Sequence, residues 1–175
     1  MKFRNGLMTA CALAAAMIAP RAVRAQTPIR FSGAVSLGLP IGDLGNAADL
    51  GYGLAFRGQG KLSSPEWAVR GDITWDRFPG RGVVDNYSYL SLAGNIVHRM
   101  PGDNLYEFVG PGLFENSVAL TNGANSSDTN LGLQMGLGLD LAKGPHTPFV
   151  EFGLTSVFTS GANTLWFPVR LGIRF

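Results

Sequence analysis

The last eleven residues of the chain, 165–175, constrain its fold more than any other stretch. Apolar side chains occupy every second position from Leu165 to Phe175, and two arginines fall at positions between them. A period of two places these two sets on opposite faces of a β-strand. Eleven residues is also about the length of a tilted strand that crosses a bilayer, and the sequence ends on an aromatic residue instead of a polar tail. The segment predicts a strand whose apolar face meets either a core or lipid.

The first twenty-five residues predict a secretory signal peptide and not part of the fold. Lys2 and Arg4 form a basic start, residues 7–19 carry no charge, and small residues lead to Ala25, where we expect cleavage. The uncharged run is too short for a membrane-spanning helix; the alternative is a buried N-terminal helix. The only cysteine, Cys11, lies inside this segment, so residues 26–175 are expected to form one domain without disulfides.

Removal of the signal reverses the sign of the net charge. Four of the fourteen Lys and Arg residues lie in it and all twelve Asp and Glu residues follow it, so the mature chain carries a net charge of −2. No basic run occurs downstream, and we therefore expect no nucleic-acid partner. No stretch of eighteen apolar residues occurs either, which argues against a membrane helix. Twenty-three glycines remain, roughly twice the usual share of about 7%.

Alternation of apolar and polar residues recurs along the whole mature chain, between stretches of turn residues. It predicts eight strands, at residues 29–39, 52–62, 67–75, 89–97, 105–115, 130–141, 149–158 and 165–175. Long connectors (40–51, 77–88 and 116–129) mostly alternate with short ones, as in outer-membrane barrels. The fold class predicted is all-β, an eight-stranded antiparallel up-and-down transmembrane β-barrel.

Three local features complicate this strand pattern. Tyr87 and Tyr89 fall in the polar phase of the fourth strand, which either a bulge or inward-facing tyrosines would explain. Pro111 and Pro168 lie inside predicted strands, where each lacks the N–H that a closed barrel would pair. We expect each proline to mark a bulge or a strand end.

The charged residues of the predicted strands fall mainly on the polar face, which we expect to line the barrel interior. Six are basic and six are acidic, so they can form a paired interior charge network, as burial requires. They are Arg30, Arg57, Lys61, Arg70, Asp72, Asp76, Glu107, Glu115, Asp140, Glu151, Arg170 and Arg174. An eight-stranded barrel is just wide enough to be filled by side chains, and glycines of the sixth strand leave room for long arginines. We expect a plugged interior.

The aromatic residues of the opposite face lie near the predicted strand ends, as in the two membrane girdles of a transmembrane barrel. The girdle set is Phe31, Tyr52, Trp67, Trp75, Tyr106, Phe114, Phe158, Phe167 and Phe175. Two soluble folds remain as alternatives. A sandwich would expose the charged face to water, and a secreted lipocalin-like barrel would turn its apolar face inward around a ligand.

Taken together, the signal, the eight strands, the glycine-rich segment YEFVGPGLF (106–114) and the terminal Phe175 resemble the OmpA/OmpX-like family of small outer-membrane barrels. The resemblance implies export to the bacterial outer membrane, contact with its lipid, and assembly by the barrel-assembly machinery, with Phe175 as the signal. It implies a monomer without a cofactor or metal. The role it implies is structural or is surface interaction through the extracellular loops, and the sequence does not identify the partner of these loops.

Two other functions within that family remain as alternatives, a small porin and a lipid A-modifying enzyme. An enzyme needs a nucleophile and a base. The two histidines, His98 and His146, both fall near the predicted periplasmic end, and neither has a serine two residues on, as the lipid A deacylases do. Asp43 and Asp49 lack a third ligand for a cation. No catalytic residue and no metal site is predicted.

Overall fold

The computed structural model describes residues 29–102, 104–159 and 162–175. The elements in chain order are β1 (Arg30–Ile41), α2 (Gly42–Ala47), β2 (Gly51–Lys61), β3 (Trp67–Pro79), β4 (Val84–Arg99), β5 (Leu105–Leu120), β6 (Asn125–Asp140), β7 (Thr147–Thr159) and β8 (Ala162–Arg174). Each of the eight strands overlaps a predicted segment, and most of them extend beyond its predicted bounds. No helix in the described part of the chain is long and apolar enough to cross a membrane.

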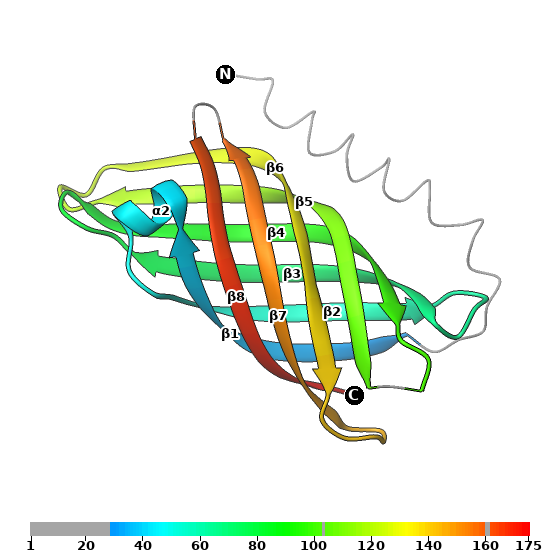
Figure 1. Ribbon diagram of the computed structural model, residues 1–175. Coiled ribbons are helices and arrows are strands. Elements are labelled where there is room, and N and C mark those ends of the chain that lie inside the picture. Colours follow the sequence, from blue (N-terminus) through cyan, green and yellow to red (C-terminus); the bar gives the residue numbers. More distant parts are fainter. Residues whose placement is uncertain (1–28, 103, 160–161) are drawn as a thin grey trace.

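The strands form a closed barrel in which each pairs antiparallel with its sequence neighbours (Figure 1). The barrel closes where β1 meets β8, in a register that runs from Ser32↔Arg174 to Ile41↔Leu165. This pairing places the start of β1 and the end of β8 at the same end, here called the terminal end. The opposite end, here called the far end, carries α2. The predicted fold class is confirmed.

The distribution of side chains is the reverse of that in a soluble globular protein. Large apolar side chains point outward, for example Leu131 and Leu92, which are 63% and 59% exposed. Charged side chains point inward, for example Arg57 and Asp72, which are 2% and 0% exposed. A lipocalin-like barrel requires the opposite arrangement, with its apolar face turned inward, so that alternative does not fit.

The facing of β5 corrects the sequence-based prediction. Tyr106 and Phe114 are buried inside the barrel, as is Phe108, whereas Glu107 and Glu115 lie exposed on the outer wall. The physical reason lies in the neighbouring strand, whose glycines face inward. A Cβ at Gly138 would collide with the Tyr106 ring, one at Gly136 with Phe108 and one at Gly132 with Phe114. Three aromatic rings of β5 therefore fill the space that we expected arginines to occupy.

Neither internal proline marks a bulge or a strand end, so that expectation was also wrong. Pro111 pairs with Leu133 of β6, and Pro168 pairs with Gly38 of β1. On the other side of each proline the ladder is interrupted without a change of register. The β4–β5 pairing passes from Ala93↔Gly112 directly to Ile96↔Val109, and the β7–β8 pairing passes from Phe152↔Val169 to Thr155↔Trp166. Because proline has no N–H, each of these strands loses ladder hydrogen bonds to only one of its two neighbours.

Two of the three long connectors at the far end are mostly strand. The β3–β4 connection spans only residues 80–83, and the β5–β6 connection spans residues 121–124, because the flanking strands run on. Only the first connector, residues 42–50, remains a loop, and it carries α2. The two tyrosines of β4 point inward, with Tyr89 buried and Tyr87 half-buried. The one register shift of the β4–β5 pairing lies between Val84 and Asn86.

Candidate functional site

The centre of the barrel is filled by a network of buried charges. Arg70 donates two hydrogen bonds to Asp72, from Nε to Oδ1 at 2.8 Å and from Nη2 to Oδ2 at 2.9 Å. Its Nη1 donates to Glu151 Oε1 at 2.8 Å. Arg57 Nη2 lies 2.7 Å from Glu151 Oε2 and its Nε lies 3.7 Å from Asp72. Gln134 Nε2 donates to Asp72 at 3.4 Å. Two arginines and two carboxylates thus neutralise each other where water is excluded.

Towards the far end the network continues through a third carboxylate. Asp76 accepts a hydrogen bond from Ser36 Oγ at 2.8 Å and one from Thr74 Oγ1 at 3.4 Å. The buried guanidinium of Arg170 interacts electrostatically with this carboxylate and with Glu151. Towards the terminal end, Asp140 accepts from Arg174 Nη1 at 2.8 Å. The charged members of the network therefore lie along the barrel axis on five strands, β2, β3, β6, β7 and β8.

The structure places eight of the twelve predicted interior charges with buried side chains, four basic and four acidic. They are Arg57, Arg70, Asp72, Asp76, Asp140, Glu151, Arg170 and Arg174. Arg30 and Lys61 have the inward phase but stand exposed at the terminal mouth. Glu107 and Glu115 do not belong to the interior. Sequence reasoning missed Arg99, whose Nη1 donates to Asp140 at 2.8 Å; its position at the end of a noisy strand hid its phase.

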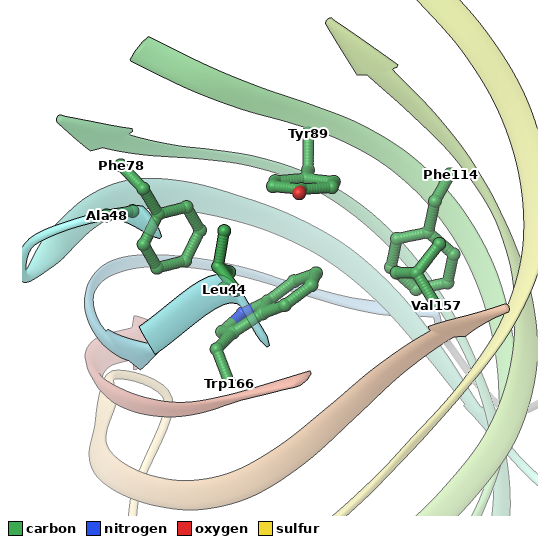
Figure 2. Packing of buried hydrophobic residues seen from close by; sticks show 7 residues of the cluster. All are labelled: Leu44, Ala48, Phe78, Tyr89, Phe114, Val157 and Trp166. Carbon is green, nitrogen blue, oxygen red and sulfur yellow. The ribbon is translucent and has the colours of Figure 1, made fainter. Parts of the chain in front are cut away.

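At the far end the lumen is closed by a cluster of apolar side chains, here called the plug. Its buried members are Leu44, Ala48, Phe78, Tyr89, Phe114, Val157 and Trp166 (Figure 2). The Trp166 ring is at the centre, with centroids 5.0 Å from Tyr89 and 5.6 Å from Phe78. Leu44 of α2 points in among these rings, as Figure 2 shows. Sequence periodicity gave no sign of the plug, because its members lie in the polar phase or in a connector, except Phe114, which the periodicity assigned to the outer face.

Seven of the nine predicted girdle aromatics lie on the outer wall, with Trp75 only half exposed. The remaining two, Tyr106 and Phe114, lie inside, as described above. At the terminal end of the wall Phe31 stacks on Phe56 with centroids 5.8 Å apart, and towards the far end Tyr52 meets the edge of Trp75 at 6.0 Å. The outward set is Phe31, Tyr52, Trp67, Trp75, Phe158, Phe167 and Phe175.

The residues considered for catalysis are scattered. His98 lies on the outer wall, where its ring packs on Trp67 at 4.5 Å between centroids and its Nδ1 lies 3.1 Å from Glu107 Oε1. His146 is exposed in the turn before β7. Asp49 is bound by Arg81 at 2.6 Å. Among the described residues, no group of three or more His, Cys, Asp or Glu could hold a metal ion.

Comparison by sequence matches the chain to no family model and to no curated protein. Comparison by structure finds Ail, the attachment invasion locus protein of Yersinia pestis, at a TM-score of 0.59 and 16% identity, covering 86% of this chain and 100% of that one. Neisserial surface protein A follows at 0.57 and 11%, covering 83% and 95%. The N-terminal β-barrel domain of Pseudomonas aeruginosa OprF gives 0.56 and 14%, covering 86% and 100%. Together with the closed eight-stranded barrel, these matches show that the chain has the fold of the small eight-stranded outer-membrane β-barrels.

Proposed function

We propose that the chain is an integral outer-membrane protein of structural or surface-interaction function, with a closed lumen. The observation that carries the proposal is the inside-out arrangement of the wall, in which leucine, valine and phenylalanine side chains point outward around a charged interior. Exposed apolar area on this scale is stable only against lipid. In the proposed orientation the terminal end faces the periplasm, and the far end, with α2, faces outward.

A closed lumen is supported by two successive barriers. The plug fills the far end with aromatic rings, and the Arg57–Arg70–Asp72–Glu151 cluster fills the middle. Charges that are held by each other are not available to solvate a passing ion. This argues against the small porin.

Surface interaction is supported by a hairpin at the far end, here called the projecting hairpin (residues 115–120 of β5 and 125–131 of β6). Here β6 pairs with β5, but no described residue of β7 pairs with 125–131, since the β6–β7 register begins at Gly132↔Val157. A hydrogen bond from Thr129 N to Asp128 Oδ1 shows that the Thr129 N–H points away from β5, and the alternation of the ladder turns Ser127 the same way. A free strand edge can take up an extended strand of another protein.

The chemistry of the far end disfavours an acidic polymer as the partner. Ail has been solved in complex with the heparin analogue sucrose octasulfate. In this chain, the arginines of the far end are already paired, Arg81 with Asp49 at 2.6 Å and Arg77 with Asp85 at 3.8 Å. The projecting hairpin adds two acidic residues, Glu115 and Asp128, and no basic residue. An extended polypeptide suits this surface better.

Absence of catalysis is also part of the proposal. Two carboxylate pairs of the predicted strands, Asp72 with Asp76 and Glu107 with Glu115, would be candidates for acid–base work. Both oxygens of Asp72 are held by Arg70, and Glu107 and Glu115 lie on the outer wall towards opposite ends of β5, so neither pair suits that role. His98 is held between Trp67 and Glu107, with no described hydroxyl bonded to it. These contacts fit structural roles.

Membrane insertion and orientation can be tested by labelling single cysteines. The only native cysteine, Cys11, lies in the predicted signal, so Ser127→Cys and Lys143→Cys would each give the mature protein one thiol. On intact cells a membrane-impermeant reagent should label Ser127→Cys, and it should label Lys143→Cys only after permeabilisation. Labelling of Lys143→Cys alone on intact cells would reverse the orientation and defeat the proposal.

Interaction through the free edge can be tested at the same position. Ser127→Pro removes an edge N–H and blocks strand addition, whereas Ser127→Ala keeps the backbone donor and serves as the control. Cells that produce the wild type or the Ala variant should adhere to host cells or immobilised proteins more than cells without the protein do. Cells that produce the Pro variant should not show this increase in adherence. Equal adherence of both variants would rule out the edge as the binding surface.

A further inference from the structure

A cavity of about 900 Å³ opens at the terminal end of the barrel, below the charge network. It is here called the vestibule. Its wall consists of the terminal ends of the strands and of residues in the turns after β2, β4 and β6. Its described charged residues are five basic and two acidic: Arg30, Lys61, Glu66, Arg99, Asp140, Lys143 and Arg174. The vestibule is therefore strongly basic, although the mature chain as a whole is acidic.

The innermost part of the vestibule holds two guanidinium groups around one carboxylate. Arg99 Nη1 and Arg174 Nη1 each lie 2.8 Å from an oxygen of Asp140. Both guanidinium groups also lie over the ring of Tyr106, at 5.3 and 5.4 Å from its centroid. One carboxylate neutralises only one of the two arginines. The side chain of Arg99 is 31% exposed, so the N–H groups that Asp140 does not use are accessible from the cavity.

The mouth of the vestibule adds three further cations, Arg30, Lys61 and Lys143, from three separate elements of the chain. All three are exposed, and none takes part in an ion pair between described residues. Glu66 is the one described carboxylate beside them.

We propose that the vestibule binds a small multivalent anion that carries phosphate or carboxylate groups. Like charges gathered in a concave site reinforce each other and attract an ion of opposite sign. The planar guanidinium of Arg99 matches the oxygens of either a phosphate or a carboxylate group. The flexible side chains of the two lysines at the mouth can reach the outer part of the ligand. This site lies at the opposite end from the projecting hairpin, so it stands or falls separately from the proposed surface interaction.

The test is calorimetric titration of the folded mature chain in a neutral detergent at low ionic strength, with pyrophosphate and, separately, with citrate. The variant Lys61→Gln/Lys143→Gln removes two exposed charges of the mouth. The control Arg77→Gln/Arg81→Gln removes the same charge from the far end. Folding of both is checked by the gel-mobility shift on boiling.

The wild type should bind at least one of the two anions, and the vestibule variant should bind it about tenfold more weakly, as expected for two partly exposed charge contacts. The far-end control should bind as the wild type does. Binding of pyrophosphate alone or of citrate alone supports the site and identifies the ligand group. Binding of neither anion, or equal weakening in both variants, overturns it.

Discussion

The Tyr106 hydroxyl donates a hydrogen bond to Glu151 Oε1 at 2.8 Å and so ties β5 to β7 across the lumen. The same carboxylate oxygen accepts from Arg70 at 2.8 Å. The bond places an aromatic ring of β5 inside the barrel, where it covers the backbone of Gly138. Glu151 thus links the charge network to the aromatic side chains of β5 inside the barrel.

The first prediction concerns that junction. Glu151→Gln preserves the shape of the side chain but leaves Arg57 and Arg70 short of a counter-ion. Removal of one partner of a buried ion pair typically costs about 3–5 kcal/mol. The midpoint of urea unfolding in detergent should therefore fall clearly. Glu107→Gln, on the outer wall, should change the free energy of unfolding by less than about 0.5 kcal/mol. Equal effects of both substitutions would show that Glu151 is not held as described.

A second prediction follows from the inward glycines of β6. Gly138→Ala places a methyl group against the Tyr106 ring, and a new contact of this kind in a packed interior costs roughly 1–3 kcal/mol. Gly94→Ala is the matched control, because its methyl group would meet nothing within 4 Å on the outer wall. In the double variant Gly138→Ala/Tyr106→Leu the cost of the alanine should shrink, since the shorter side chain frees the space. Full additivity in a thermal unfolding series would contradict the contact.

The sequence predicts the eight strands and the facing of most of them, because their two faces differ strongly in polarity. It fails at β5, which is apolar on both faces. Tyr106 and Phe108 share one phase, while Val109 and Leu113 share the other with two glutamates. Polarity alone assigned the aromatic residues to lipid. The facing of β5 is decided by the next strand, β6, whose inward glycines leave space for aromatic rings. This information can be used only when the register between β5 and β6 is known.

The far end could not be predicted for a different reason. Residues 125–129 are Asn, Ser, Ser, Asp and Thr, which have turn propensity and no apolar face. They become strand because β5 and β6 continue to pair in one register up to the tight turn at Gly123. Pairing that depends on a partner strand leaves no pattern in the sequence itself. The plug could not be predicted for a similar reason, since its members come from five strands, from α2 and from the residue after α2, and meet only in the closed barrel.

The third prediction concerns conduction. In a planar bilayer the wild type should show no steady channel, because both the plug and the charge network obstruct the lumen. Trp166→Ala alone should remain closed, since the network lies below it. The double variant Trp166→Ala/Glu151→Ala weakens both barriers and should show bursts of current. Steady channels of uniform size from the wild type would make the small porin the better interpretation.

The last prediction separates stability from assembly at Phe175. The backbone of this residue is paired with β1, since its N–H donates to Phe31 O at 2.8 Å and its carbonyl accepts from Phe31 N at 3.1 Å. Its ring, however, points outward and is 53% exposed. Phe175→Ala keeps both backbone bonds and should fold in detergent with nearly the stability of the wild type. In cells, the amount of folded protein in the outer membrane should drop severalfold, because we expect the assembly machinery to read the terminal ring. Phe167→Ala, on the same face of β8 and 44% exposed, is the control and should assemble normally. If Phe175→Ala assembles in cells as well as Phe167→Ala does, the terminal phenylalanine is not the assembly signal.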